Sequence, residues 1–444
     1  MFLPVGIWLT LYISYDVNLP VQLAGSDRNI EARYFFCYNK KMKKNFVVLF
    51  NYGGGMRGLV PAHLMARIEE ATGFKMADMV DVFAGPSTGS ILNAALTIPH
   101  PDFPERPKYK ARHLVRFYER EGIKIFPQDR FRAFRGLIHD FNNRTMKLNQ
   151  LNWLFRHGHY DSKNLAHALR MLFGKHKIEQ AISGLVIPVY NIDGDQIEVV
   201  EEFNETGDDP VRTKNNFYET GGHALWIKHM DTGHGFKPDM DMSLVDAVLA
   251  SCAAPTFFPC HHFPVRYAKK KKTVYYSGID GSIFDNPCIS YHGAIRNHIP
   301  PDSNVIMIVL GTGYTNRSFT RHEWNRMGAL GVVDPVNDLP LINIFFHASE
   351  TALMDSFAES MGDNLYVFNK SLFPTSQKED YPSPQIDDAS PENVERLKRF
   401  ADTIYEENQV RFDALCELLV QNKKDRDSQE KKKKGFLSGI LGMD

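Results

Sequence analysis

The stretch from Gly85 to Gly89 (GPSTG) constrains the fold more than any other part of the chain. It lies where the strand pattern of residues 79–84 (MVDVFA) gives way to the apolar helix pattern of residues 90–96 (SILNAAL). Glycines on both sides of a serine allow a tight strand-to-helix turn that holds the hydroxyl out at the edge of a sheet. The pattern indicates a nucleophile elbow at Ser87, although a helix-capping serine in an ordinary turn gives the same letters.

A second glycine-rich turn, Gly53 to Gly58 (GGGMRG), follows the apolar strand pattern of residues 46–51 and precedes a helix pattern. Consecutive glycines leave backbone N–H groups uncovered near the positive end of a helix, so this loop is expected to bind an anion. A nucleotide phosphate fits poorly, because the P-loop lysine is missing and the dinucleotide fingerprint does not match. The oxyanion of an acyl-transfer intermediate is favoured, because Ser87 would end a neighbouring strand.

A third motif, residues 277–282 (SGIDGS), follows the strand pattern of residues 273–276. An aspartate between small residues at the end of a strand is, taken alone, most simply a turn residue. Only the presence of the two glycine turns in the same chain raises the question of another role for Asp280.

These motifs, in this order, resemble those of the patatin-like phospholipases, which are lipid acyl hydrolases. That family carries a glycine-rich oxyanion loop, a G-x-S-x-G elbow and a late Asp-Gly turn. Residues 250–259 (ASCAAPTFFP) and 305–313 (VIMIVLGTG) are similar to two further family segments, so the resemblance covers about residues 45–315. It implies a patatin-like three-layer α/β/α fold with a largely parallel central sheet.

The resemblance also implies a role for individual residues. Ser87 is the nucleophile and Asp280 its base, in a dyad without a histidine. The oxyanion donors are Gly53, Gly54 and Gly55. The residues that complete the motifs are Arg57, Gly58, Gly85, Gly89 and Gly281. An acyl-serine intermediate is implied, and neither a metal nor an organic cofactor.

Three residues depart from the family pattern. Tyr52 stands where the family usually has aspartate or asparagine, so a different group must anchor the glycine loop. Pro86 precedes the nucleophile, where it fixes φ and removes an N–H, but the elbow strains the serine and not its predecessor. Ser282 replaces a small residue of similar size. None of these changes removes a reacting group.

A histidine triad remains the chemical alternative, because the sequence contains 17 histidines. In that case Asp280 would orient a histidine instead of acting as the base. The candidates are His261, His262, His292 and His298.

Composition excludes little. Lys plus Arg is 52 against 53 for Asp plus Glu, a net charge of -1, so nothing global indicates nucleic acid. The five cysteines are scattered, which suits a reducing compartment.

Cys252 and Cys260, with His261 and His262 nearby, do not favour a metal site. Residues 128–156 are rich in arginine and aromatics, and we rank a packed helical insertion, a lipid cap and a nucleic-acid surface in that order.

The chain divides into four parts by its pattern. Residues 1–41 read as a disordered arm or a mis-assigned start, with a signal peptide as the second interpretation, and a chain beginning at Met42 is expected to fold. Residues 42–370 form the catalytic domain, and 371–422 a linker and C-terminal helix. Residues 423–444 form a charged tail, in which a lysine cluster followed by an apolar segment predicts a reversible membrane anchor or a disordered end.

The predicted function is that of a serine lipid acyl hydrolase of the phospholipase A or lysophospholipase type. Its expected partner is a phospholipid membrane surface and not nucleic acid, and any protein partner is unknown. The expected location is cytoplasmic and peripheral at membranes, with a secreted effector as the alternative. The rival hypotheses are a Ser-His-Asp esterase and a catalytically silent lipid-binding or partner-binding protein. Intact Ser87, Asp280 and glycine loop argue against the silent protein.

Overall fold

The computed structural model describes residues 44–127, 160–193, 221–230, 240–255, 257–267, 272–315, 318–332, 340–373 and 380–441. The chain divides into two units, Met1–Lys43 and Lys44–Asp444, and the described residues all belong to the second. The predicted N-terminal arm, the arginine-rich and aromatic region at 128–156 and most of the basic run at 269–272 lie outside the described residues.

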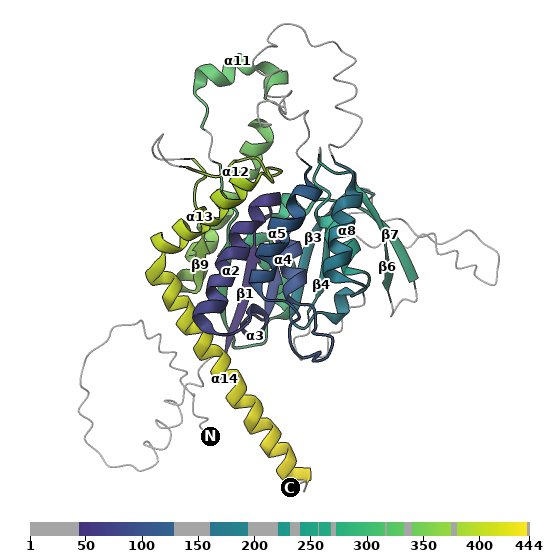
Figure 1. Ribbon diagram of the computed structural model, residues 1–444, viewed down its shortest axis with the longest axis vertical. Coiled ribbons are helices and arrows are strands. Elements are labelled where there is room, and N and C mark those ends of the chain that lie inside the picture. Colours follow the sequence, from purple (N-terminus) through teal and green to yellow (C-terminus); the bar gives the residue numbers. More distant parts are fainter. Residues whose placement is uncertain are drawn as a thin grey trace, which may run out of the picture. The chain divides into compact units, whose positions relative to one another are not determined.

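Nine strands of the described residues form one sheet in the order β5-β6-β7-β3-β2-β1-β8-β9, with β4 paired to β3 (Figure 1). The strands are β1 (Asn45–Asn51), β2 (Val82–Ala84), β3 (Gly184–Asn191), β4 (His223–His229), β5 (Met240–Asp241), β6 (His261–Tyr267), β7 (Lys272–Ile279), β8 (Asn304–Leu310) and β9 (Leu365–Phe368). The block β3-β2-β1-β8-β9 is parallel, and β4 and β7 pair with β3 in the antiparallel sense. The sheet is therefore largely parallel at its centre, as predicted.

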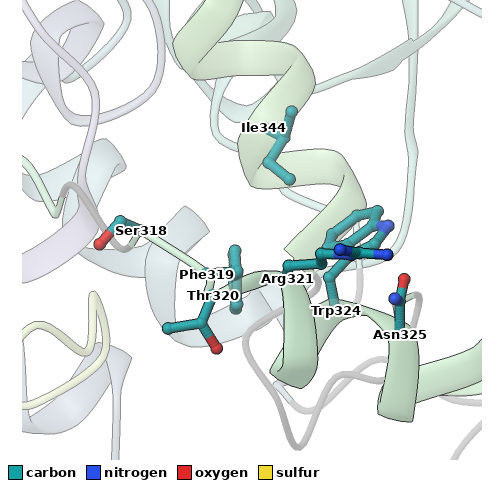
Figure 2. Close-up of a pocket in the computed structure, with 7 residues that line it drawn as sticks. All are labelled: Ser318, Phe319, Thr320, Arg321, Trp324, Asn325 and Ile344. Carbon is teal, nitrogen blue, oxygen red and sulfur yellow. The ribbon is translucent and has the colours of Figure 1, made fainter.

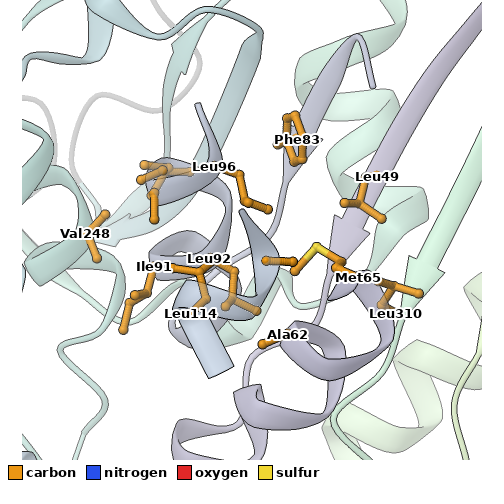
Figure 3. Packing of buried hydrophobic residues seen from close by; sticks show 14 of the residues in the cluster. Leu49, Ala62, Met65, Phe83, Ile91, Leu92, Leu96, Leu114, Val248 and Leu310 are labelled. Carbon is orange, nitrogen blue, oxygen red and sulfur yellow. The ribbon is translucent and has the colours of Figure 1, made fainter. Parts of the chain in front are cut away.

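Helices cover both faces of this sheet because its central strands are apolar on both sides. In β1, Val47 and Leu49 enter one core, whereas Phe46, Val48 and Phe50 enter the other. The first core is shared with α2 (Leu59–Thr72), α4 (Thr88–Leu96), α5 (Ala111–Ile125), α8 (Ser162–Phe173) and α9 (Leu244–Ser251), and Figure 3 shows part of its packing. The second is shared with residues 291–295 and with α12 (Pro340–Met361). The predicted three-layer α/β/α fold is confirmed.

The C-terminal extension is two helices, α13 (Pro391–Glu407) and α14 (Gln409–Leu441). Their apolar side chains join the first core, and Asp402 of α13 accepts hydrogen bonds from Arg67 of α2. Helix α14 continues beyond residue 422, where the sequence pattern predicts a tail, because its many charged residues are good helix formers. Arg426 pairs with Asp81 at 2.5 Å, just before β2, so α14 leaves the body at the sheet edge where β1 and β2 begin.

Short elements complete the described chain. They are η1 (Gly55–Gly58), α3 (Met76–Met79), η2 (Ile178–Gln180), η3 (Gly281–Phe284), α10 (Pro287–Ser290), η4 (Tyr291–Ile295), η5 (Arg296–His298), α11 (Arg321–Gly331) and η7 (Gly362–Asn364). Among the described helices, none combines the length and the apolar character needed to cross a bilayer.

Candidate active site

The elbow forms where the sequence predicts it. Ser87 lies in the turn between β2 and α4 with φ 50° and ψ -126°, a conformation that a residue with a Cβ rarely adopts. Its N–H donates to the Ser251 carbonyl at 3.1 Å and to the Ser251 hydroxyl at 3.0 Å. The Ser90 hydroxyl donates to the Ser87 carbonyl at 2.6 Å. The strained serine is thus held by hydrogen bonds on both sides.

The two flanking glycines are required by the close approach of β1. A Cβ at Gly85 or at Gly89 would lie 2.0 Å or 2.1 Å from the carbonyl oxygen of Asn51, the last residue of β1. Gly85 also has φ 144°. The elbow can therefore pack against the end of β1 only if both positions lack a side chain.

The sheet topology brings Asp280 to this elbow. Strand β4 pairs with β3 along residues 185–191, so β2 and β7 must share the other edge of β3. On that edge β2 pairs at residues 184–186 and β7 pairs at 190–191 in the opposite direction. The chain segments that leave β2 and β7 therefore converge, and Gly281 fits because a Cβ there would lie 2.1 Å from the Pro188 carbonyl oxygen.

Asp280 is buried, with 4% of its surface exposed. Burial raises the pKa of its carboxyl group to about 7, against hydrogen bonds from Ser282, Gly281 and the Ser87 hydroxyl that lower it. A carboxylate with such a pKa is a much stronger base than an exposed aspartate. Ser87 and Asp280, predicted as a pair, thus lie close enough for the serine hydroxyl to influence the pKa of the aspartate.

The predicted segment 250–259 supports both residues. Besides the Ser251 contacts to the elbow, the Ala253 carbonyl accepts the Asp280 N–H at 3.1 Å. Cys252 is buried beside Ser87, and burial raises the pKa of its thiol. Sequence reasoning found this segment by its likeness to the family but did not assign these contacts.

The glycine loop lies directly beside Ser87. A Cβ at Gly53 would be 3.3 Å from the Ser87 Cβ. The loop turns through two residues with positive φ, Gly54 at 148° and Gly55 at 56°, and leads into α2 through η1. Among the described residues, the N–H groups of Gly54 and Gly55 meet no acceptor. Two backbone donors are therefore available in the loop whose first glycine lies beside Ser87.

The remaining loop groups are held by later parts of the chain. The Gly53 N–H donates to Asp285, at 3.1 Å to Oδ1 and 2.9 Å to Oδ2. The Thr312 hydroxyl donates to the Gly53 carbonyl at 2.6 Å. The Met56 N–H donates to the Ile386 carbonyl at 2.7 Å. Sequence reasoning expected a different anchor because of Tyr52, but nothing in the sequence pattern pointed to these three residues.

Charged groups surround the anchor of the loop. Burial raises the pKa of Asp285 well above its ordinary value, whereas the Gly53 hydrogen bond and the nearby Arg57 lower it. Burial lowers the pKa of Arg57 to about 10, opposed by Asp285. Burial raises the pKa of Tyr52, and the nearby Glu350 and Asp285 raise it further.

The histidines of the alternative triad have contacts of their own. His261 Nε2 lies 2.9 Å from Asp246, His262 Nδ1 lies 3.1 Å from Ser277, His298 Nε2 lies 3.2 Å from Lys228 Nζ, and the His292 ring packs on Tyr291 and Phe357. Within the described ranges, no group of three His, Cys, Asp or Glu side chains could hold a metal ion.

Two surface features flank the described fold. A hollow of about 430 Å³ lies among Phe319, Trp324 and Ile344, and Figure 2 shows its lining residues, which belong to α11, α12 and the segment just before α11. Four apolar side chains are well exposed beyond the ends of β3, β7, β8 and β9. They are Ile192 (44%), Ile283 (44%), Tyr314 (38%) and Phe373 (45%).

Comparisons with known proteins cover the elbow, the glycine loop and the Asp280 turn. A family model described as patatin-like phospholipase matches residues 52–291, which contain the glycine loop, Ser87 and Asp280. The chain is 27% identical to patatin-like protein 2 of Arabidopsis thaliana over 67% of each chain. It is 24% identical to patatin-04/09 of Solanum tuberosum over 87% of this chain and 92% of that protein. Human group IVD cytosolic phospholipase A2 aligns with a TM-score of 0.36 and 11% identity, over 86% of this chain and 59% of its own.

Proposed function

The chain belongs to the patatin-like phospholipase family, and from that premise we propose that it is a serine lipid acyl hydrolase acting through Ser87 and Asp280. Its substrates are acyl esters of membrane glycerophospholipids, as in a phospholipase A or a lysophospholipase. The observation that carries the proposal is that the buried Asp280 carboxyl group lies near enough to the Ser87 hydroxyl for that hydroxyl to lower its pKa, although burial raises it overall. We assign catalysis to residues 42–370, with the C-terminal helices packed on them.

The first half of the reaction forms the acyl-serine. As the Ser87 oxygen attacks the ester carbonyl carbon, Asp280 takes the hydroxyl proton. Collapse of the tetrahedral intermediate breaks the bond to the alcohol, and Asp280 returns the proton to that leaving oxygen. In the second half, water attacks the acyl-serine, Asp280 accepts its proton, and the proton passes to the Ser87 oxygen as the fatty acid leaves.

The oxyanion needs donors that are not already used. The Gly53 N–H is directed at Asp285, so of the three predicted donors we assign the oxyanion to the N–H groups of Gly54 and Gly55. A preorganised donor of this kind contributes roughly 3 kcal/mol to transition-state stabilisation.

The exposed apolar side chains support a lipid surface as the partner. Ile192, Tyr314 and Phe373 follow the ends of the parallel strands β3, β8 and β9, and Ile283 lies close to Asp280 in the chain. Parallel strands end at one edge of a sheet, which is also where the elbow and the glycine loop lie. Exposed apolar side chains that follow the strand ends on the side of the sheet that carries a reactive serine suit entry of an acyl chain from a bilayer.

Fatty-acid release from vesicles of mixed phospholipids tests the proposal. Wild type is expected to release fatty acid equally with and without a chelator, and Ser87→Ala is expected to release none. The His292→Ala and His298→Ala variants serve as controls for the triad. Absence of release by wild type, even with cell extract added, contradicts the proposal and favours a silent lipid-binding or partner-binding protein.

A further inference from the structure

The glycine loop cannot hold its own shape. Gly53, Gly54 and Gly55 have no side chains, and glycine loses more conformational freedom on folding than any other residue. Oxyanion donors are effective only when they are held within about 0.5 Å of the productive position before the reaction begins. Other parts of the molecule must therefore restrict the loop.

The structure holds the Gly53 residue from both sides. Its N–H is bound by the Asp285 carboxyl group at 2.9 and 3.1 Å, and its C=O by the Thr312 hydroxyl at 2.6 Å. On the N-terminal side, the Tyr52 N–H donates to the Leu310 carbonyl at 3.1 Å, which ties the loop to β8.

Because the peptide group is planar, the hydrogen bonds that hold Gly53 also set the direction of the next N–H group. The Gly53 C=O and the Gly54 N–H belong to one planar trans peptide group, so they point in opposite directions. When Thr312 binds the C=O, the direction of the Gly54 N–H is set as well. Asp285 fixes the preceding peptide plane, and the two planes together bound both dihedral angles of Gly53.

We propose that Asp285 and Thr312 are positioning residues that clamp Gly53 and thereby aim the Gly54 N–H at the oxyanion beside Ser87. This inference rests on the proposed function and adds the residues that make its oxyanion hole. Asp285 lies at the end of the turn that begins with Asp280, so the base and one of the two positioning residues belong to the same turn. The other positioning residue, Thr312, follows β8.

The groups around Asp285 explain how a carboxyl group can be tolerated close to the oxyanion. A negative charge near a developing oxyanion is unfavourable unless a cation offsets it. Arg57, a residue of the loop, is half-buried and interacts electrostatically with Asp285. The clamp requires an acceptor for the Gly53 N–H and not the negative charge itself, so asparagine is expected to replace Asp285.

Matched substitutions test the clamp. Asp285→Leu and Thr312→Val remove the acceptor and the hydroxyl, whereas Asp285→Asn and Thr312→Ser keep them. With a soluble ester, the first pair is expected to lower kcat about 100-fold with KM changed less than about twofold, and the second pair to stay within about threefold of wild type. Labelling of Ser87 by a fluorophosphonate should slow in parallel with kcat.

Hydrogen exchange keeps the inference separate from the proposed function. Amides of residues 52–58 should exchange faster in Asp285→Leu and Thr312→Val than in their conservative partners, while residues 85–91 stay unchanged. If wild type neither hydrolyses ester nor is labelled, the function fails and the exchange result still decides the clamp. Equal exchange in all variants, a loss confined to KM, or an equal kcat loss in Asp285→Asn and Asp285→Leu would overturn it.

Discussion

The elbow and the glycine loop are both strand-to-helix turns that follow neighbouring parallel strands, yet they are held in different ways. At the elbow, Gly85 and Gly89 allow the turn to press against the Asn51 carbonyl at the end of β1. In the glycine loop, Asp285 and Thr312, far away in the sequence, bind the backbone of Gly53. Both turns have distant hydrogen-bond partners, since Ser251 binds the Ser87 N–H, but only in the glycine loop do side chains bind both the N–H and the C=O of one glycine.

This difference predicts different kinds of sensitivity. A turn that depends on close packing loses stability when a methyl group is added, because its neighbour is backbone and cannot move aside. When one partner is removed from a turn that depends on a few hydrogen bonds, the protein stays folded but the backbone N–H groups of the turn lose their fixed direction. Substitutions at the two turns should therefore separate folding from catalysis.

The largest effect is expected at the reacting groups, which can be changed without disturbing either turn. Ser87→Ala and Asp280→Asn should each lower kcat by about 10⁴-fold or more, and the double variant should be no worse, because the two groups act as one unit. Activity assays paired with thermal unfolding check this. Near-normal activity of Asp280→Asn, together with an inactive His292 or His298 variant, would establish the histidine triad instead.

The next effect concerns the packing of the elbow. Gly89→Ala places a Cβ 2.1 Å from the Asn51 carbonyl oxygen, so the free energy of unfolding should fall by roughly 3 kcal/mol. Gly221→Ala is the matched control, because nothing lies within 4 Å of a Cβ there. Its free energy of unfolding should change by less than about 0.5 kcal/mol. Equal denaturation midpoints for the two variants would mean that packing does not shape the elbow.

The pH dependence of activity and of stability isolates Asp280. In the proposed mechanism the Asp280 carboxylate is the base, and its pKa is about 7, so kcat/KM should fall about tenfold per pH unit below that value.

Ionisation of Asp280 should affect stability and activity in opposite directions: as pH rises, activity increases and stability decreases. The pKa in the folded protein lies above the ordinary value of 3.8, so the stabilisation is full below 3.8 and is lost as pH rises through about 7. Relative to wild type, Asp280→Asn should therefore be more stable at about pH 8 than at about pH 5. Melting temperatures of both proteins decide the matter, and a difference independent of pH would contradict the raised pKa.

The smallest effect on catalysis is expected from the far end of the molecule. Helix α14 leaves the body where β1 and β2 begin, whereas both turns lie where these strands end. Deleting residues 431–444 should leave kcat on a soluble ester unchanged but reduce co-sedimentation with anionic vesicles, by about 1 kcal/mol for each lysine lost. Binding that ignores both salt and the deletion would argue against a membrane role for the tail.

The sequence by itself determined the features that depend on local sterics. Apolar periodicity placed β1, β2 and β8, and the glycines around Ser87 identified the elbow, because a strained turn tolerates few residue types. The order of the motifs with Asp280 indicated the family and, through it, the three-layer fold. The sequence pattern predicted a tail after residue 422 because that segment is highly charged, whereas α14 continues to Leu441. Lysine and glutamate are compatible with a long helix.

Only the tertiary structure decided how the motifs meet. The approach of β2 and β7 along one edge of β3 brings Ser87 and Asp280 together, and burial there raises the Asp280 pKa. The contacts of Asp285 and Thr312 with Gly53 depend on where separate strands and turns end in space. No local pattern encodes such contacts, because a hydrogen bond between distant segments is set by the register and order of the strands that carry them.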